Sequence, residues 1–203
     1  MLQVIDNFLP DQERQALQQV CKIHGGLRQQ LDGDALFSWF PTDDSAPPAR
    51  SPHTPASQAV VKRYLHQHLL KEIDRLTQEH VGVEWWCNTN NDLDWHIDKD
   101  ETFASLTGHF SLPLLSTVFY PHVSCAGGEL LVADNEPVQN NMPGHRPSFR
   151  SVISIPPVKN RLVLFTQGIL HRINSLEGER YSFALNVWDH LPQKKPNQKS
   201  TKA

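Results

Sequence analysis

Apolar and polar residues recur along the chain with two different periods, first that of helices and then that of strands. Apolar side chains follow helical spacing over residues 11–23, where Asp11 is a candidate N-cap, and again over residues 55–80. Thr54-Pro55 supplies an N-cap and a first-turn proline for the second segment. The pattern therefore predicts two amphipathic helices, 11–23 and 55–80, that pack on the outside of a core.

The segment between these helices, residues 27–56, is rich in Asp, Pro and Ser. Its repeated prolines disfavour regular structure. A long loop in a compact domain is either functional or mobile. We therefore consider two interpretations: a lid over a site, in which Trp39 or Arg50 contacts substrate, and a surface loop.

From Val83 onward the period changes to that of β-strands. Strands are predicted at residues 83–87, 93–98, 115–120, 128–132, 150–155, 161–165, around His171 and at 181–187. Short strands in this number after two helices are typical of a sandwich or barrel with helices packed on one sheet. We expect a mainly β, α+β domain over residues 1–192, with its β core at 83–190.

Length, charge and cysteine usage narrow the class of protein. At 203 residues the chain suits one well-buried domain. The net charge of −3 argues against a broad basic surface for nucleic acid, and the basic segment 193–203 is predicted to be a disordered tail. Cys21, Cys87 and Cys125 are widely spaced, which favours a reducing compartment. Without a signal segment or an apolar stretch of about 20 residues, we expect a cytoplasmic protein with no membrane span.

The stretch Asp94-Trp95-His96-Ile97-Asp98 places a histidine and a carboxylate two residues apart in a predicted strand. Side chains alternate between the faces of a strand, so His96 and Asp98 point to the same side, together with Asp94. Such a pair can bind one metal ion. The alternative interpretation is a strand with a polar face and no ligand.

A second histidine downstream would complete a known kind of metal site. Two histidines and one carboxylate on one face of an octahedral ion suit non-haem Fe(II). His171 is the candidate, because it follows the apolar run 162–165 and a turn with Gly168, and Arg180 comes nine residues later. If the strands flanking residues 174–179 pair antiparallel, His171 and Arg180 fall on the same face. One pocket can then hold a metal and an anion.

Arg180 belongs to a strand whose two faces differ. One face is large and apolar, and the other is small and polar around the arginine: Tyr181, Phe183, Leu185 and Val187 against Arg180, Ser182, Ala184 and Asn186. A buried guanidinium needs an anionic partner, since burying a lone charge is costly. A dicarboxylate supplies one through a bidentate pair. The alternative is a surface ion pair with Glu177 or Glu179.

These motifs resemble the Fe(II)- and 2-oxoglutarate-dependent dioxygenases, and within them the prolyl-hydroxylase-like branch. The resemblance spans residues 84–188 and, more loosely, the opening VIDNFLP at 4–10. It implies a double-stranded β-helix, or jelly roll. It further implies the following site: His96, Asp98 and His171 bind iron, and Arg180, Tyr120 and the Ser182 of an R-x-S pattern bind 2-oxoglutarate. Gly127-Gly128-Glu129-Leu130 resembles the GGxL strand opening of the family.

The activity implied by this resemblance is hydroxylation of an unactivated C–H bond, with decarboxylation of 2-oxoglutarate to succinate. Fe(II), 2-oxoglutarate and O2 are the implied cofactors and co-substrates, and ascorbate is a candidate reductant. Asp98 favours hydroxylation, because halogenating members carry a small residue there. The expected substrate is a small molecule or peptide, namely a free or peptidyl amino acid with proline first. The alternatives are a non-catalytic sensor module that binds 2-oxoglutarate and metal, and a nucleic-acid demethylase, which Asn186 disfavours because that branch has a second arginine there.

Overall fold

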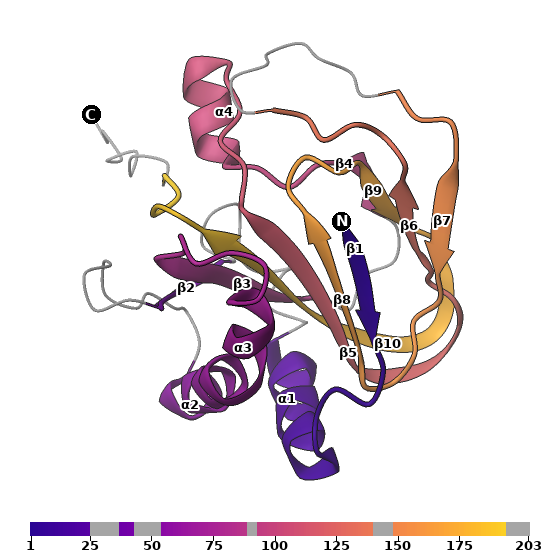
Figure 1. Cartoon of the computed structure of the whole chain (residues 1–203). Helices are drawn as coiled ribbons and strands as arrows, with labels where there is room; N and C mark the ends of the chain where they lie inside the picture. Colours follow the sequence, from indigo (N-terminus) through magenta and orange to yellow (C-terminus); the bar gives the residue numbers. More distant parts are fainter. Residues whose placement is uncertain (25–36, 43–53, 89–92, 140–147, 194–203) are drawn as a thin grey trace, which may run out of the picture.

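Two antiparallel sheets form the core of the protein (Figure 1). A computed structural model of the chain describes residues 1–24, 37–42, 54–88, 93–139 and 148–193. The larger sheet contains, in spatial order, β1 (Leu2–Ile5), β8 (Arg161–Thr166), β5 (Leu115–Gly127), β10 (Leu176–Trp188), β3 (Gly82–Asn88) and β2 (Ser38–Pro41). The smaller sheet contains β4 (Leu93–His96), β9 (His171–Ile173), β6 (Leu130–Ala133) and β7 (Val152–Ile155). This is the jelly-roll architecture that the sequence analysis predicts.

Helices cover the outer face of the larger sheet (Figure 1). They are α1 (Asp11–His24), α2 (Pro55–Tyr64), the π-helical turn η3 (Leu65–Leu69) and α3 (Leu70–Ile73). The side chain of Thr54 accepts a hydrogen bond from the Ser57 amide, so the predicted N-cap is confirmed. The second helical segment ends at Ile73 rather than near residue 80, because the chain turns there towards β3.

The apolar face of β10 packs against these helices. Phe183, Leu185 and Val187 are fully buried in a cluster with Leu17 of α1 and Val61 of α2. The large apolar face that the sequence predicts for this strand is therefore the one that packs against the helices. A second cluster lies between the two sheets and takes residues from both: Tyr120, Leu130, Val132, Ile155, Val163, Phe165, Ile169 and Ile173. The inner face of the larger sheet therefore looks onto the smaller one.

The structure contains two elements that the hydrophobic pattern did not predict. Strand β2 lies at the edge of the larger sheet, inside the segment expected to lack regular structure. Its two-residue apolar centre, Trp39-Phe40, is buried. Helix α4 (Glu101–Thr107) begins where the Asp100 side chain accepts a hydrogen bond from the Phe103 amide, and it ends at Gly108 with φ of 72°. Both cap residues are visible in the sequence, but the helix between them is short.

The strand pairing around residues 174–179 differs from the prediction. Strand β9 pairs with β4 and β6 in the smaller sheet, whereas β10 pairs with β5 and β3 in the larger one. His171 and Arg180 therefore lie on facing sheets rather than on one face of a hairpin. The reason is that the short β9 is satisfied by two neighbours of its own, so the chain crosses between sheets at Asn174 and Ser175.

Within the described ranges, no helix is long and apolar enough to cross a membrane. The predicted tail lies outside the described residues from position 194 onward. The domain boundaries at 192 and the cytoplasmic location stay predictions.

Candidate active site

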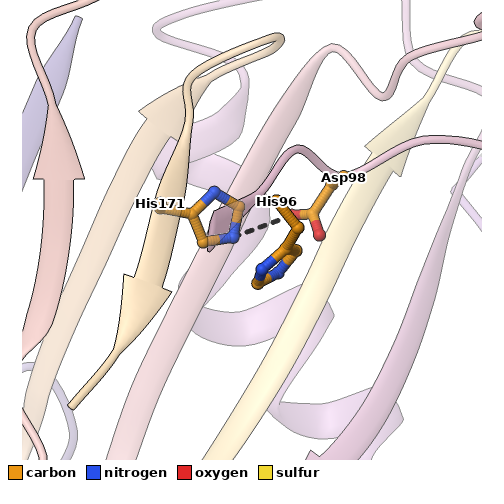
Figure 2. Close-up of side chains that lie close together, drawn as sticks. All are labelled: His96, Asp98 and His171. Carbon is orange, nitrogen blue, oxygen red and sulfur yellow. Dashed lines mark ion pairs between the residues drawn. The ribbon is translucent and has the colours of Figure 1, made fainter. Parts of the chain in front are cut away.

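Three side chains from two strand ends meet at one point, as Figure 2 shows. His96 ends β4, Asp98 follows it by two residues, and His171 begins β9. Residues 96 and 171 are direct partners in the β4–β9 pairing, which brings the two imidazoles together with ring centroids 4.3 Å apart. One potential ligand atom from each side chain lies within 4.8 Å of the other two. Residues far apart in sequence thus form the cluster that the sequence analysis predicts.

Backbone carbonyl groups orient both imidazoles. His96 Nδ1 donates a hydrogen bond of 2.7 Å to the Asp94 carbonyl oxygen. His171 Nδ1 donates one of 2.9 Å to the Ile169 carbonyl oxygen. Since a carbonyl oxygen can only accept, each Nδ1 carries a proton, and in the neutral imidazole each Nε2 presents its lone pair. This is the arrangement of metal-binding histidines, whose second nitrogen is held by a hydrogen bond.

The charges at the cluster also suit a cation. Burial lowers the pKa of His171, the neighbouring His96 acts in the same direction, and Asp98 opposes both. The neutral form, which is the one that binds a metal, is thus favoured at His171. Ser116 Oγ on β5 donates a hydrogen bond of 2.6 Å to Asp98 Oδ2. Asp98 Oδ2 lies 3.9 Å from His171 Nε2.

Arg180 and Tyr120 form a second polar group, buried between the sheets. Their exposed fractions are 1% and 0%. The Arg180 guanidinium carbon lies 5.8 Å from the centroid of the Tyr120 ring, and Nη1 donates a hydrogen bond of 2.8 Å to the Gly128 carbonyl oxygen. Glu177 and Glu179 are exposed, and Glu179 lies 3.6 Å from His122. The alternative of a surface ion pair for Arg180 is therefore wrong.

The Tyr120 hydroxyl group is a buried donor. It has no hydrogen-bond partner among the described residues. Burial raises the pKa of Tyr120 to about 12, against the opposing effect of Arg180. The hydroxyl is consequently neutral near pH 7 and can donate to an anion that reaches Arg180. A buried donor without a partner destabilises the fold unless a ligand or a water molecule accepts its hydrogen bond.

The glycines of the GGxL motif explain how the backbone reaches Arg180. Gly127 and Gly128 have φ of 75° and 77°, a left-handed conformation that favours glycine. They turn the chain from β5 into β6, and a Cβ at Gly127 would lie 2.5 Å from the Ser175 carbonyl oxygen. This turn places the Gly128 carbonyl on the guanidinium. Ser182, two residues after Arg180 on β10, is buried and donates to the Asn88 carbonyl oxygen at 3.2 Å.

A cleft of about 200 Å³ opens beside His96 and Asp98. Trp86 and Phe37 form one aromatic wall, with ring centroids 5.1 Å apart in an edge-to-face contact. Asn186 and Glu84, paired across β10 and β3, line the same cleft. Asn186 is 4% exposed, and its Oδ1 has no hydrogen-bond partner in the described parts of the chain.

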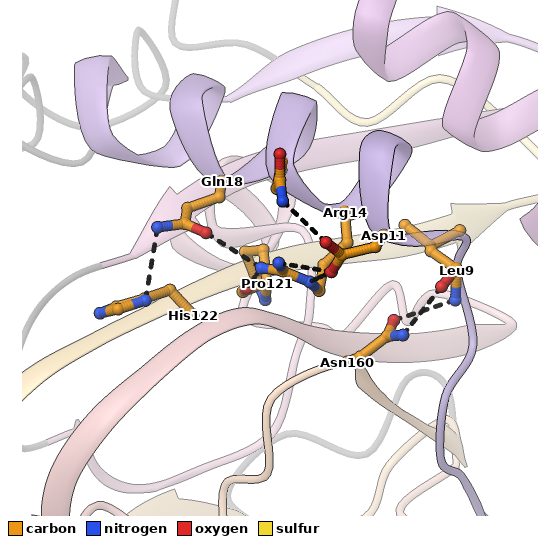
Figure 3. Close-up of polar contacts among 8 residues, drawn as sticks. Leu9, Asp11, Arg14, Gln18, Pro121, His122 and Asn160 are labelled. Carbon is orange, nitrogen blue, oxygen red and sulfur yellow. Dashed lines mark hydrogen bonds and ion pairs between the residues drawn. The ribbon is translucent and has the colours of Figure 1, made fainter.

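Other candidates from the sequence lie elsewhere. Trp39 is 3% exposed and packs against Gly82, so it does not present a surface to substrate, and Arg50 lies outside the described residues. A further histidine, His122, contacts Gln18 of α1 on the outer side of the larger sheet (Figure 3). Over the described residues, His96, Asp98 and His171 are the only cluster of three or more potential metal ligands.

The sequence analysis missed two features that support the cluster. These are the Ser116 hydroxyl group and the Ile169 carbonyl group. Ser116 is an inward-facing polar residue in a largely apolar strand, which is a signal that a sequence can carry. The Ile169 contact comes from backbone atoms and has no such signal. Asp94, which the sequence places on the same face as His96, contacts that histidine through its carbonyl oxygen.

Comparison with known proteins agrees with this geometry. Residues 83–188 match the family model of the 2OG-Fe(II) oxygenase superfamily. This match covers more than half of the chain, so the chain belongs to that superfamily. Its members use Fe(II) and 2-oxoglutarate, which implies both for this enzyme. No curated protein sequence matches the chain.

Solved structures of prolyl hydroxylases share the fold. A Pseudomonas putida prolyl-4-hydroxylase is 17% identical, with a TM-score of 0.56 over 92% of this chain and 86% of that one. A Trichoplax adhaerens prolyl hydroxylase, solved in complex with a peptide fragment of the hypoxia inducible factor oxygen degradation domain, is 16% identical, with a TM-score of 0.55 over 93% and 83%. A Phytophthora capsici prolyl 4-hydroxylase is 15% identical, with a TM-score of 0.51 over 97% and 63%. At these identities the likeness concerns the jelly roll itself.

Proposed function

We propose that the enzyme hydroxylates an aliphatic C–H bond of a free or peptidyl amino acid, with proline as the first candidate. In this proposal His96, Asp98 and His171 hold Fe(II). The observation that carries it is the donor set: two imidazoles whose Nδ1 atoms are engaged by carbonyl oxygens, facing one carboxylate. Two nitrogens and one oxygen on one face suit non-haem Fe(II) and leave positions open for other ligands.

Arg180 and Tyr120 hold the distal carboxylate of 2-oxoglutarate. A guanidinium and a neutral phenol hydroxyl, both buried, match a carboxylate that accepts charge-assisted hydrogen bonds. We assign Ser182 to the same 2-oxoglutarate site, because it follows Arg180 by two residues on the inner face of β10. Its hydroxyl group is already engaged by the Asn88 carbonyl oxygen, so it contributes less than Tyr120.

When bound, iron, 2-oxoglutarate and O2 supply the oxidising chemistry that inserts oxygen into a C–H bond and yields succinate and CO2. The chain itself binds, orients and shields. Asp98 occupies the third protein ligand position, which favours hydroxyl transfer over halogenation. Ser116 holds one carboxylate oxygen of Asp98 so that its orientation is fixed. Ascorbate is assigned the role of maintaining Fe(II).

The shape of the cleft supports an amino-acid substrate. Its aromatic wall, Trp86 with Phe37, suits the apolar face of a small ring. The peptide in the Trichoplax structure lies on a protein of the same fold, which supports a peptide as one form of the substrate. The net charge of −3 supports neither DNA nor RNA as the alternative.

An anaerobic Fe(II) titration tests the proposal. The wild-type protein should show the weak visible charge-transfer band of the Fe(II)–2-oxoglutarate chelate, and His96→Ala should lose it. Arg180→Ala should need about tenfold to a hundredfold more 2-oxoglutarate, the loss expected for charge-assisted hydrogen bonds.

A second buried arginine provides the matched control. Arg14 is a residue of α1 and is 6% exposed; its side chain donates to Asp11 and to the Pro121 carbonyl oxygen (Figure 3). Arg14→Ala should destabilise the fold but leave the 2-oxoglutarate requirement of the folded protein unchanged. A wild-type protein without the band at saturating iron and 2-oxoglutarate would contradict the proposal. Binding without succinate release in the presence of any proline-containing substrate would indicate the sensor module instead.

A further inference from the structure

We propose that Asn135 is a positioning residue for the metal site, holding the turn at residues 168–170 so that His171 faces His96 and Asp98. The inference rests on the proposed role of His171 as a ligand. Asn135 follows β6 and is only 6% exposed, yet it contacts neither the cleft nor the three ligands. Its side chain instead makes hydrogen bonds to backbone groups.

Three hydrogen bonds attach Asn135 to the backbone. Oδ1 accepts from the Leu170 amide at 2.9 Å. Nδ2 donates to the Gly168 carbonyl oxygen at 3.2 Å and to the Glu136 carbonyl oxygen at 2.8 Å. The side chain therefore binds the residues immediately before and after Ile169. A buried amide with this many partners constrains both ends of a three-residue turn.

Ile169 is the residue through which this constraint reaches the metal site. Its carbonyl oxygen accepts the hydrogen bond of 2.9 Å from His171 Nδ1. The contact sets the tautomer and the ring orientation of His171. Any shift of the turn would move the Ile169 carbonyl and rotate the imidazole with it. Partners of this kind typically change metal affinity by about tenfold to a hundredfold when they are removed.

The backbone on either side of Asn135 also contacts the turn at residues 168–170. The Val138 amide donates to the Gly168 carbonyl oxygen at 3.1 Å, and the Ala133 amide donates to the Leu170 carbonyl oxygen at 2.9 Å. Gly168 has φ of 70°, and a Cβ there would lie 2.4 Å from the Val138 carbonyl oxygen. The close approach requires glycine and leaves the turn little freedom to relax.

A small apolar cluster connects this turn to the other two ligands. Val138 is buried together with Ile97, the residue between His96 and Asp98, and Leu170 packs against them. Asn135 thus lies at the start of a segment that binds the backbone of the turn before His171 and packs against Ile97 through the Val138 side chain. Its hydrogen bonds to this turn fix the position of His171 relative to His96 and Asp98.

The experiment is a Co(II) titration of the full chain, followed by the visible absorption of the bound ion. Co(II) binds such sites more tightly than Fe(II), so weakened affinities stay measurable. Asn135→Ala should bind Co(II) about tenfold to a hundredfold more weakly than the wild type. In the background of His171→Ala, adding Asn135→Ala should change the affinity by less than about twofold, because the ligand it positions is gone.

Asn160→Ala is the matched control. The Asn160 side chain also makes two hydrogen bonds to backbone, accepting from the Leu9 amide at 2.9 Å and donating to the Leu9 carbonyl oxygen at 2.8 Å (Figure 3). These bonds join the segment before α1 to the residue before β8 and do not involve the turn before His171. Asn160→Ala should lower the melting temperature but not the Co(II) affinity. The inference is overturned if Asn135→Ala binds Co(II) as tightly as the wild type, or if it loses no more Co(II) affinity than Asn160→Ala does. It is also overturned if the full loss of Co(II) affinity persists in the His171→Ala background.

Two further results separate the possible failures. If His171→Ala itself binds Co(II) like the wild type, the proposed metal site is wrong and the inference falls with it. If Asn135→Ala does not fold, Asn135→Asp replaces it: the acceptor for Leu170 stays, and the donor to Gly168 becomes an oxygen. Its added negative charge alone would strengthen cation binding, so weaker Co(II) binding in this variant supports the inference and unchanged or tighter binding overturns it.

Discussion

The two sheets differ in how their geometry is maintained. In the larger sheet β5 and β10 each have 13 residues, pair along most of their length and are backed by helices. In the smaller sheet the strands have three or four residues, and its edge strand β7 leaves Val152 and Ile153 39% and 49% exposed. Long, buried ladders define their own geometry. Short strands do not, so the smaller sheet depends on individual contacts.

The candidate site lies across this division. Arg180, Tyr120 and Ser116 belong to the long strands of the larger sheet, whereas His96 and His171 belong to short strands of the smaller one. The side chains of the first group point into the space between the sheets simply because side chains alternate between the two faces of a regular strand. The second group needs carbonyl oxygens at Asp94 and Ile169 to orient its imidazoles. Stability and metal geometry should therefore respond to different substitutions.

The largest expected effect is on stability, from the larger sheet. Phe183 is fully buried, with its ring centroid 5.2 Å from Trp85 and 5.4 Å from Tyr64. Phe183→Ala should lower the free energy of unfolding by about 3–5 kcal/mol, because it removes packing and leaves a cavity. Urea denaturation of the metal-free protein measures this loss.

A truncation in the smaller sheet is the comparison. Ile153→Ala on β7 removes a half-exposed side chain and should change the free energy of unfolding by about 0.5 kcal/mol or less. Both folded variants should keep the wild-type affinity for Co(II). Weakened metal binding in folded Phe183→Ala would mean that the two sheets are not separable in this way.

The next effect concerns metal affinity, from a hydrogen bond that joins the larger sheet to the cluster. Ser116→Ala removes the hydrogen bond of 2.6 Å to Asp98 Oδ2 and should weaken Co(II) binding about tenfold. Thr117 is its control: the neighbouring hydroxyl group is 1% exposed, points to the helix-covered side and has no hydrogen-bond partner among the described residues. Thr117→Val should leave Co(II) binding unchanged. Equal effects of the two substitutions would show that Ser116 acts only through the strand.

The smallest effect is a pH dependence at the edge of the larger sheet. Arg161 donates hydrogen bonds of 2.6 and 2.8 Å to Asp6, and these hold the pKa of Asp6 below its ordinary value of 3.8. Because the folded pKa lies below the unfolded one, the contribution to stability is present above pH 3.8 and is lost as the pH falls through the folded pKa. Asp6→Asn should thus be slightly less stable than the wild type at pH 6.

Urea denaturation of Asp6→Asn and wild type between pH 6 and pH 2.5 measures this difference. The two midpoints should converge as the pH falls. Since Asp6 is exposed, the difference should also shrink in high salt. A difference that widens towards low pH would contradict the assigned role of the pair.

Much of the architecture could be predicted from the sequence because it depends on local periodicity. Helical spacing locates α1 and the α2–α3 segment, and alternation locates most strands, including the two distinct faces of β10. The order of His96, Asp98, His171 and Arg180 also indicates the class of site, because ligand types and strand alternation are properties of the chain itself. The family match agrees with that indication.

Long-range pairing decided the rest. The sequence alone could not assign β9 and β10 to different sheets, because a short strand followed by a long one is equally compatible with a hairpin. The contacts of Ser116 with Asp98, and of Asn135 with the backbone beside Ile169, join residues 18 and more than 30 positions apart. The Ser116 contact exists only once the sheets face each other, and the Asn135 contacts only once β6 pairs with β9. The chain therefore specifies the ligands, and the tertiary structure specifies their orientation.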